Sequence, residues 1–122
     1  MEANKSTLLR KSFTNAIAII ELYKFLIYEK KEFVLSKQLL RSGTSVGANI
    51  REAQNAESKP DFIHKLAIAQ KECDETIYWL ELLKETNFIT ENIFDITTKQ
   101  FSEVYKMLTS ALITLKLKKI NQ

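Results

Sequence analysis

The sequence predicts an all-α protein, an antiparallel up-down-up-down four-helix bundle in one domain over residues 1–122. The chain has only two glycines and one proline, which indicates few turns and long helices. Apolar residues recur at spacings of three and four along four long stretches, the period of an amphipathic helix. The breaks between these stretches are short, as expected where consecutive helices pack antiparallel.

The first helix, expected over about residues 7–30, is apolar on two sides. One set of apolar residues has the spacing of a core stripe: Leu9, Phe13, Ala16, Ile17, Ile20, Tyr23 and Ile27. A second set lies on the opposite side: Ile19, Leu22, Phe25, Leu26 and Tyr28. Because a helix of a monomeric bundle normally has one apolar face, we expect both sides to be buried. The helix is either central in the bundle or, as we favour, part of a contact between subunits.

The second helix, expected over about residues 34–56, contains both glycines of the chain. Each glycine inside a helix costs about 1 kcal/mol relative to alanine, so two of them need a structural reason. The spacing from Gly43 to Gly47 puts both on one side, where we expect another helix to approach closely.

A polar line runs along the same helix beside an apolar one. The polar line consists of Gln38, Ser42, Ser45, Asn49 and Glu52, and the apolar line of Leu39, Gly43, Val46, Ile50 and Ala53. We interpret the polar line as a buried hydrogen-bond network that fixes helix register. A ligand or partner site that uses Asn49 and Glu52 is the alternative.

The third and fourth helices are expected over about residues 59–86 and 91–118, and each begins with a capping signal. Ser58 is a suitable N-cap, Pro60 is tolerated in the first turn, and Asp61 can complete a capping box. Thr90 is the expected N-cap of the fourth helix. The expected core positions are Phe62, Leu66, Ala69, Cys73, Ile77 or Thr76, Leu80 and Leu83, then Phe94, Phe101, Val104, Leu108, Ala111 and Leu115.

Charge is unevenly distributed along the chain, although the net charge is only +3. Residues 1–51 carry nine Lys/Arg against four Asp/Glu, residues 52–95 four against ten, and residues 96–122 five against one. The third helix is therefore acidic and the others basic. Two basic groups are candidates for a nucleic-acid interface, although a solvated face is the usual explanation of such residues: Lys30, Lys31, Lys37, Arg41 and Arg51, and Lys116, Lys118 and Lys119.

The residue types that carry chemistry do not form a recognisable site. His64 is the only histidine and has no Glu-x-x-His pattern around it, so no metal is expected. Cys73 is the only cysteine and lies on the core stripe, which indicates a buried, unreactive thiol in a reducing cytoplasm. No phosphate-binding loop or nucleophile motif occurs, so we expect neither cofactor nor enzyme activity. The start of the chain is polar, and no apolar run is long enough to cross a membrane, so neither leader nor membrane partner is expected.

Two groups of residues carry a resemblance to a known family: Gln38, Leu39, Arg41, Ser45, Asn49, Ile50 and Glu52, then Tyr78, Trp79, Leu80 and Glu81. The chain, most strongly from about Tyr23 to Ile89, resembles the bacterial four-helix-bundle proteins first found encoded in intervening sequences of 23S ribosomal RNA genes. A departure is Gly47 with Ala48, where many relatives carry proline or other small residues, so a straighter second helix is expected here.

The resemblance implies an antiparallel bundle that assembles into a ring-shaped homo-oligomer, a pentamer. It also implies kinship with the accessory protein of diversity-generating retroelements, a basic pentameric barrel that works with a reverse transcriptase and nucleic acid. For the family in general, molecular function is not established.

Two functions are therefore expected from the sequence. The first is a non-enzymatic oligomeric scaffold or adaptor in the cytoplasm that binds RNA, DNA or a nucleic-acid-handling protein through its basic surfaces. The second is a structural or protein-interaction module that binds no nucleic acid. An enzyme with its site at a subunit boundary ranks last. A closed ring needs two complementary patches per subunit, and apolar area on the first helix with opposite charge on the third would supply them.

Overall fold

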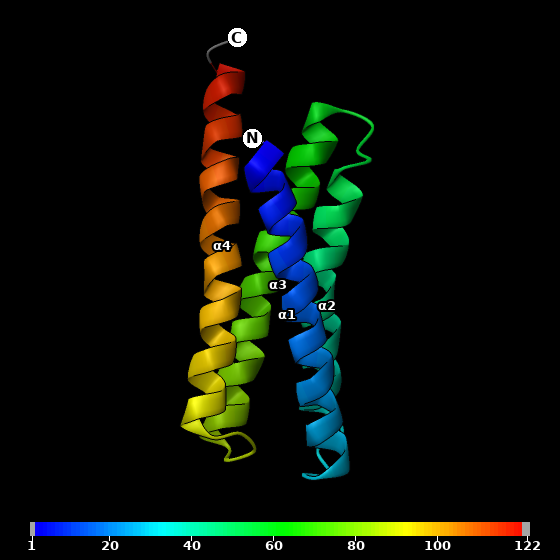
Figure 1. The fold of residues 1–122 in the computed structure, drawn as a ribbon, viewed down its shortest axis with the longest axis vertical. Helices are drawn as coiled ribbons and strands as arrows, with labels where there is room; N and C mark the ends of the chain where they lie inside the picture. Colours follow the sequence, from blue (N-terminus) through cyan, green and yellow to red (C-terminus); the bar gives the residue numbers. More distant parts are fainter. Residues whose placement is uncertain (1, 121–122) are drawn as a thin grey trace.

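A computed structural model describes the backbone from Glu2 to Ile120 and the side chains of residues 5–118. Four helices run alternately up and down (Figure 1): α1 Glu2–Tyr28, α2 Leu35–Ala53, α3 Lys59–Glu85 and α4 Glu91–Ile120. The predicted all-α four-helix bundle is confirmed, and the described part of the chain contains no strand. The main difference in bounds is at α1, which begins at Glu2 rather than near residue 7. The contact between α1 and α4 is the least extensive of the four between neighbouring helices.

The core lies along the axis of the bundle, and most of the core positions predicted for α2, α3 and α4 are buried in it. On α2 it buries Leu39, Val46, Ile50 and Ala53, on α3 Leu66, Ala69, Cys73, Thr76, Leu80 and Leu83, and on α4 Phe101, Val104, Leu108, Leu112 and Leu115. Thr76 rather than Ile77 is the buried position of its turn, and Leu112 is more deeply buried than its neighbour Ala111.

In α1 the predicted core stripe is wrong, because the opposite side of the helix faces the core. The buried residues are Leu8, Ser12, Asn15, Ile19, Leu22 and Leu26. On the predicted stripe, Phe13 is 58%, Ile17 48% and Ile20 37% exposed. The apolar pattern favoured the wrong side because Ser12 and Asn15 occupy two core positions. Asn15 is satisfied there by donating from Nδ2 to the Gln100 carbonyl of α4 at 2.9 Å.

Both glycines of α2 face α1. A Cβ atom at Gly43 would lie 2.7 Å from Ile19 Cγ1, and one at Gly47 would lie 3.3 Å from the Ser12 carbonyl oxygen. The side chain of Ile19 therefore packs directly on the backbone of α2, the close approach that the spacing of the glycines predicts.

The starts of α3 and α4 have the predicted N-caps, Ser58 and Thr90, but Asp61 accepts from the amide before Ser58 rather than from the Ser58 amide of a capping box. Ser58 Oγ accepts a hydrogen bond from the Asp61 amide at 3.2 Å, and Asp61 Oδ2 accepts one from the Glu57 amide at 3.1 Å. Thr90 Oγ1 accepts one from the Ile93 amide at 3.2 Å. The bonds to the Asp61 and Ile93 amides satisfy donors in the first turns of α3 and α4 that have no partner within the helix.

The start of α2 is capped by a residue that the sequence did not indicate. Glu32 lies in the connection before α2, and its carboxylate accepts hydrogen bonds from the amides of Val34, Leu35 and Ser36 at 3.2, 3.0 and 2.7 Å. Ser36 Oγ in turn donates to the Glu32 carbonyl at 2.7 Å. One buried acid therefore accepts hydrogen bonds from three consecutive amides at the start of α2.

Candidate functional surfaces

The polar line of α2 is divided among different partners in the structure. Ser45 Oγ donates to the Arg41 carbonyl at 2.7 Å and Asn49 Nδ2 to the Ser45 carbonyl at 2.9 Å, so both bond within α2. Ser42 is the fully buried member, and it accepts a hydrogen bond from Thr76 Oγ1 of α3 at 2.9 Å. A register contact between α2 and α3 thus rests on Ser42 rather than on the line as a whole.

The two ends of the polar line are exposed. Glu52 Oε1 accepts a hydrogen bond from Lys65 Nζ of α3 at 3.0 Å, and this bond and the charge of Glu52 raise the pKa of Lys65. Gln38 Oε1 accepts a long bond, 3.4 Å, from Arg41 Nε. Glu52 also lines a cleft between α1 and α2, but Asn49 and Gln38 do not line that cleft.

Arg41 is the centre of an ion-pair cluster between α2 and α3. Its Nη1 atom lies 3.2 Å from Glu72 Oε2, and its Nη2 atom pairs with Glu75. Trp79 Nε1 also donates to Glu75 Oε2 at 3.1 Å. Because two carboxylates offset the charge of the guanidinium, Arg41 attracts a phosphate less than an unpaired arginine would.

The remaining basic candidates lie at two opposite ends of the bundle (Figure 1). One group lies at the connection between α1 and α2 and consists of Lys30, Lys31 and Lys37. The other lies at the ends of α2 and α4 and consists of Arg51, Lys116 and Lys118. All six are exposed, and the side chain of Lys119 lies outside the described residues. The structure therefore does not bring the basic candidates into one surface.

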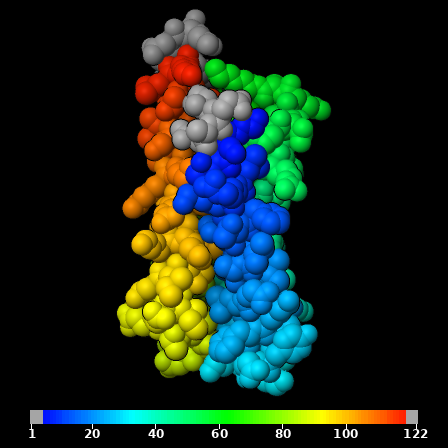
Figure 2. All heavy atoms as spheres, in the orientation of Figure 1, coloured from blue at the N-terminus to red at the C-terminus, as the bar shows by residue number. Residues whose placement is uncertain are grey.

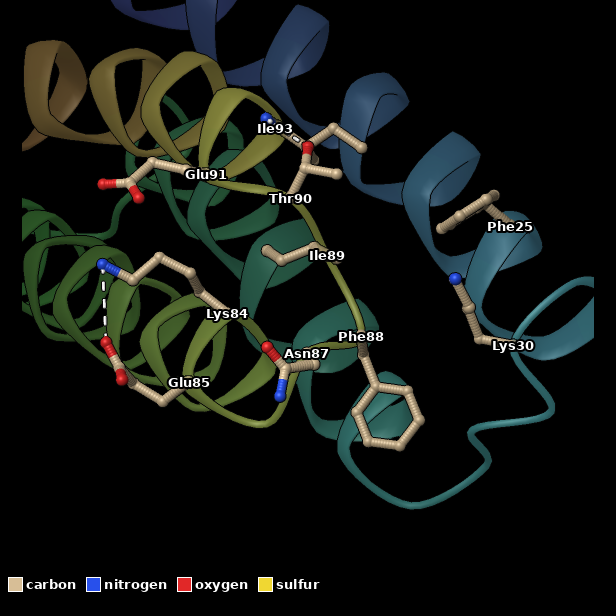
Figure 3. A pocket seen from close by; sticks show the side chains of 10 residues that line it. All are labelled: Phe25, Lys30, Lys84, Glu85, Asn87, Phe88, Ile89, Thr90, Glu91 and Ile93. Atoms are coloured by element: carbon tan, nitrogen blue, oxygen red, sulfur yellow. Dashed lines mark hydrogen bonds and ion pairs between the residues drawn. The ribbon is translucent and has the colours of Figure 1, made fainter.

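A cavity of about 620 Å³ separates the end of α1 from the connection between α3 and α4. Figure 3 shows Phe25 and Lys30 on one side of it and the segment from Lys84 to Ile93 on the other. Lys84 Nζ lies 3.6 Å from Glu85 Oε1, and Glu91 also lines the cavity, so its charges balance. The cavity offers no excess charge to attract an ionic ligand.

A shallower cleft of about 320 Å³ follows the outer groove between α1 and α2. Phe13 and Ala16 line it from α1 and Gly47 and Ala48 from α2, and the charged residues Arg51 and Glu52 of α2 also border it. Together with the exposed residues Ile17 and Ile20, the cleft forms one largely apolar outer face, which we call the α1 outer face. Figure 2 looks onto α1 from this outer side.

The two residues most suited to chemistry are placed where the sequence suggested. His64 is exposed near the start of α3. Cys73 is fully buried, and burial, followed by the charges of Asp74 and Glu72, raises the pKa of its thiol to about 12. Among the described residues no cluster of histidine, cysteine, aspartate or glutamate could hold a metal ion. No helix in the described part of the chain combines the length and apolar character that crossing a membrane requires.

The chain matches a family model described as 23S rRNA-intervening sequence protein over residues 4–110. It is also similar to a solved structure of a protein of unknown function from the S23 ribosomal protein family of Bacteroides thetaiotaomicron VPI-5482. The two are 51% identical, the alignment covers 89% of this chain and 97% of the other, and the TM-score is 0.89. No curated protein matches the chain.

Proposed function

The chain belongs to the 23S rRNA-intervening sequence protein family, and we propose that it is a non-enzymatic homo-oligomeric scaffold whose copies meet through the α1 outer face. The observation that carries this proposal is the exposure of Phe13, Ile17 and Ile20 on consecutive turns of one helix. Single exposed apolar residues are ordinary on a protein surface, whereas a contiguous apolar face is typical of an interaction site.

The geometry of the face favours a helix from a second copy as its occupant. The cleft beside Phe13, about 320 Å³, leaves room on the outside of α1 and α2 for a side chain from a neighbouring helix. Burying each half-exposed side chain would contribute about 1 kcal/mol. Contacts of this strength are weak singly and add up when a ring closes.

A ring also requires a second, different patch, and α4 carries one. Ile113 and Leu117 are exposed one turn apart on α4, at 54% and 55%. On α3, Glu72 and Glu75 pair with Arg41 of α2, and Glu85 pairs with Lys84. Asp74 and Glu81 are therefore the exposed acids of α3 left to attract basic residues of another copy. The resemblance described above implies five copies, and we propose a closed pentamer.

We propose nucleic acid, or a protein that handles it, as the partner of this scaffold. Exposed lysines occur at both ends of each subunit, and a ring would repeat each group by symmetry, so weak phosphate contacts would add. A protein-interaction role without nucleic acid is the second candidate. The observation that favours it is the division of the basic residues between two ends, with Arg41 held by carboxylates.

Light scattering after size-exclusion chromatography tests the assembly. We expect the wild type to elute as one closed oligomer and Ile17→Glu to elute as a folded monomer, because a charge cannot be buried at the α1 outer face. Ile96→Glu is a matched control, since Ile96 is 55% exposed on α4 outside this face, and it should assemble like the wild type. A monomeric wild type at both low and high salt would refute the proposal.

A titration across salt concentrations tests the partner. Phosphate contacts release counterions, so the logarithm of the affinity should fall linearly with the logarithm of the salt concentration. Absence of binding to single- and double-stranded RNA and DNA at low salt would decide for the protein-interaction role.

A further inference from the structure

The connection between α1 and α2 exposes apolar side chains that the bundle does not use. Val34 is 73%, Tyr28 66% and Phe33 53% exposed, and the first two are the most exposed large hydrophobic residues in the described part of the chain. Such exposure costs solubility unless a partner covers the side chains, so these residues indicate an interaction site.

The same short segment is basic. Lys30, Lys31 and Lys37 are exposed, and none of them forms an ion pair with a described residue. Lys30 Nζ lies 5.7 Å from the centroid of the Phe25 ring and also lines the cavity described above. Of the two acids in the segment, Glu32 is buried and its carboxylate is taken by three backbone amides, so only Glu29 opposes the lysines at the surface. In the sequence Lys30 and Lys31 lie between the exposed residues Tyr28 and Phe33, and Lys37 follows Phe33 by four residues.

The connection is also held in one conformation. Its Glu32 amide donates to the Leu26 carbonyl at 3.0 Å, and the Glu32 carboxylate fixes the first turn of α2. Lys31 adopts a left-handed backbone with φ of 54°, which directs the chain around the turn. A partner would therefore meet side chains on a backbone that needs little further ordering, which favours binding.

We propose that this connection is a docking site for single-stranded nucleic acid, in which Phe33 and Tyr28 stack on bases while Lys30, Lys31 and Lys37 contact phosphates. It rests on the nucleic-acid part of the proposed function and assigns that part to one end of the subunit. Exposed aromatic rings among lysines are the combination that sequence-tolerant single-strand binding requires. The rings would find no bases to stack on in a duplex, whose base faces are covered.

The site lies at the edge of the proposed contact between copies. Tyr28 follows Ile17 by about three helical turns, so it continues the α1 outer face beyond Lys24. Phe33 lies past the end of α1 and outside that face. In a closed oligomer the site would therefore recur at one rim, once per copy, and a strand could follow successive sites.

Fluorescence anisotropy with labelled oligo-uridine and oligo-thymidine, using the assembled full chain, tests the proposal. We expect Phe33→Ala to weaken binding about tenfold without changing the salt slope, because it removes stacking and leaves the phosphate contacts. Phe33→Tyr should restore binding. Lys31→Gln should weaken binding and lower the salt slope by about one, the mark of a lost phosphate contact.

Two matched controls keep the result specific. Tyr78 is as exposed as Phe33, at 53%, and lies on α3, so Tyr78→Ala should bind like the wild type. The double variant Lys116→Gln with Lys118→Gln removes the same kind of charge from the other basic end, and because the stacking rings lie at the α1–α2 connection it should weaken binding less than Lys31→Gln.

Each other outcome overturns the proposal in a different way. Binding that survives Phe33→Ala and Lys31→Gln but is lost with the two α4 lysines would place the site elsewhere and leave the nucleic-acid function intact. No binding of the wild type to either probe at low salt would overturn both. A change of oligomer size in Phe33→Ala would identify the occupant as a second copy of the chain.

Discussion

The two connections at the lower end of the bundle in Figure 1 each contain a residue with left-handed backbone, but one connection buries its apolar side chains and the other exposes them. Lys31 between α1 and α2 and Asn87 between α3 and α4 are the described residues other than glycine with positive φ, 54° and 67°. After Asn87 the chain turns inward, and Ile89 is only 6% exposed. After Lys31 it turns outward, and Phe33 is 53% exposed.

The hydrogen bonds that close the two turns also differ: the turn after α3 uses backbone groups alone, and the turn after α1 also uses a side chain. At the end of α3 the Phe88 amide donates to the Leu83 carbonyl at 2.9 Å and the Asn87 amide to the Lys84 carbonyl at 3.0 Å, the pattern of a Schellman motif. At the end of α1 the turn is wider, and a side chain, Glu32, supplies the bonds that start the next helix. One connection closes the core with apolar residues, whereas the other is held by a carboxylate and leaves its apolar residues free.

The largest difference between the connections should appear when their apolar side chains are removed. Ile89→Ala should lower the free energy of unfolding by about 2–4 kcal/mol, because it opens a cavity beside Leu83. Phe33→Ala should change it by less than about 0.5 kcal/mol. Urea denaturation at one fixed protein concentration measures both, since the apparent stability of an oligomer depends on concentration. Equal losses would show that Phe33 is buried in solution.

Glu32 should be the second most sensitive position. In Glu32→Gln one acceptor oxygen is replaced by an NH₂ group, so the amides of Val34, Leu35 and Ser36 cannot all be satisfied. We expect a loss of about 1–2 kcal/mol, as for the loss of a strong helix cap. Glu29→Gln, an exposed neighbour, is the control and should be neutral. A neutral Glu32→Gln would mean that water replaces the carboxylate at little cost.

The cap of α4 should contribute less. Thr90→Ala removes the acceptor of the Ile93 amide and should lower the stability by about 1 kcal/mol. Thr90→Ser retains the hydroxyl and should be close to the wild type. If both variants lose stability equally, the methyl group of Thr90 matters rather than its hydrogen bond.

The smallest effect, with the opposite sign, is expected at the two left-handed residues. Lys31→Gly should raise the stability by about 0.5 kcal/mol, because glycine adopts positive φ without strain. Asn87→Gly should gain less, since asparagine already tolerates this conformation. Thermal unfolding of the two variants side by side compares them, and a destabilised Lys31→Gly would contradict strain at that position.

The sequence was sufficient for the fold wherever the pattern was local. The stripes of α2 and α3 and the caps at Ser58 and Thr90 depend on residues three or four positions apart, which a sequence shows directly. The orientation of α1 was predicted wrongly because both of its sides are apolar and the one facing the core includes Ser12 and Asn15. Only the carbonyl of Gln100, far along the chain, explains why Asn15 is inside.

The candidate surfaces were harder to predict, because they too depend on contacts between residues far apart in the chain. Arg41 pairs with Glu72 and Glu75 across two helices, so its charge could not be assigned from spacing within α2. Glu32 stands before its helix rather than at the usual cap position, and its sequence context does not distinguish it from a solvated acid. The exposure of Tyr28 and Phe33 depends on the path of the connection between α1 and α2, which the sequence does not show, although it does show aromatic residues beside Lys30 and Lys31.

The buried Cys73 can report how often the bundle opens. Thiol reagents react with the thiolate, and complete burial with a pKa of about 12 leaves almost none of it accessible in the folded state. Labelling of Cys73 must therefore wait for the helices to separate, so its rate counts opening events of the bundle. Because the chain has one cysteine, the labelling rate reports on a single known site.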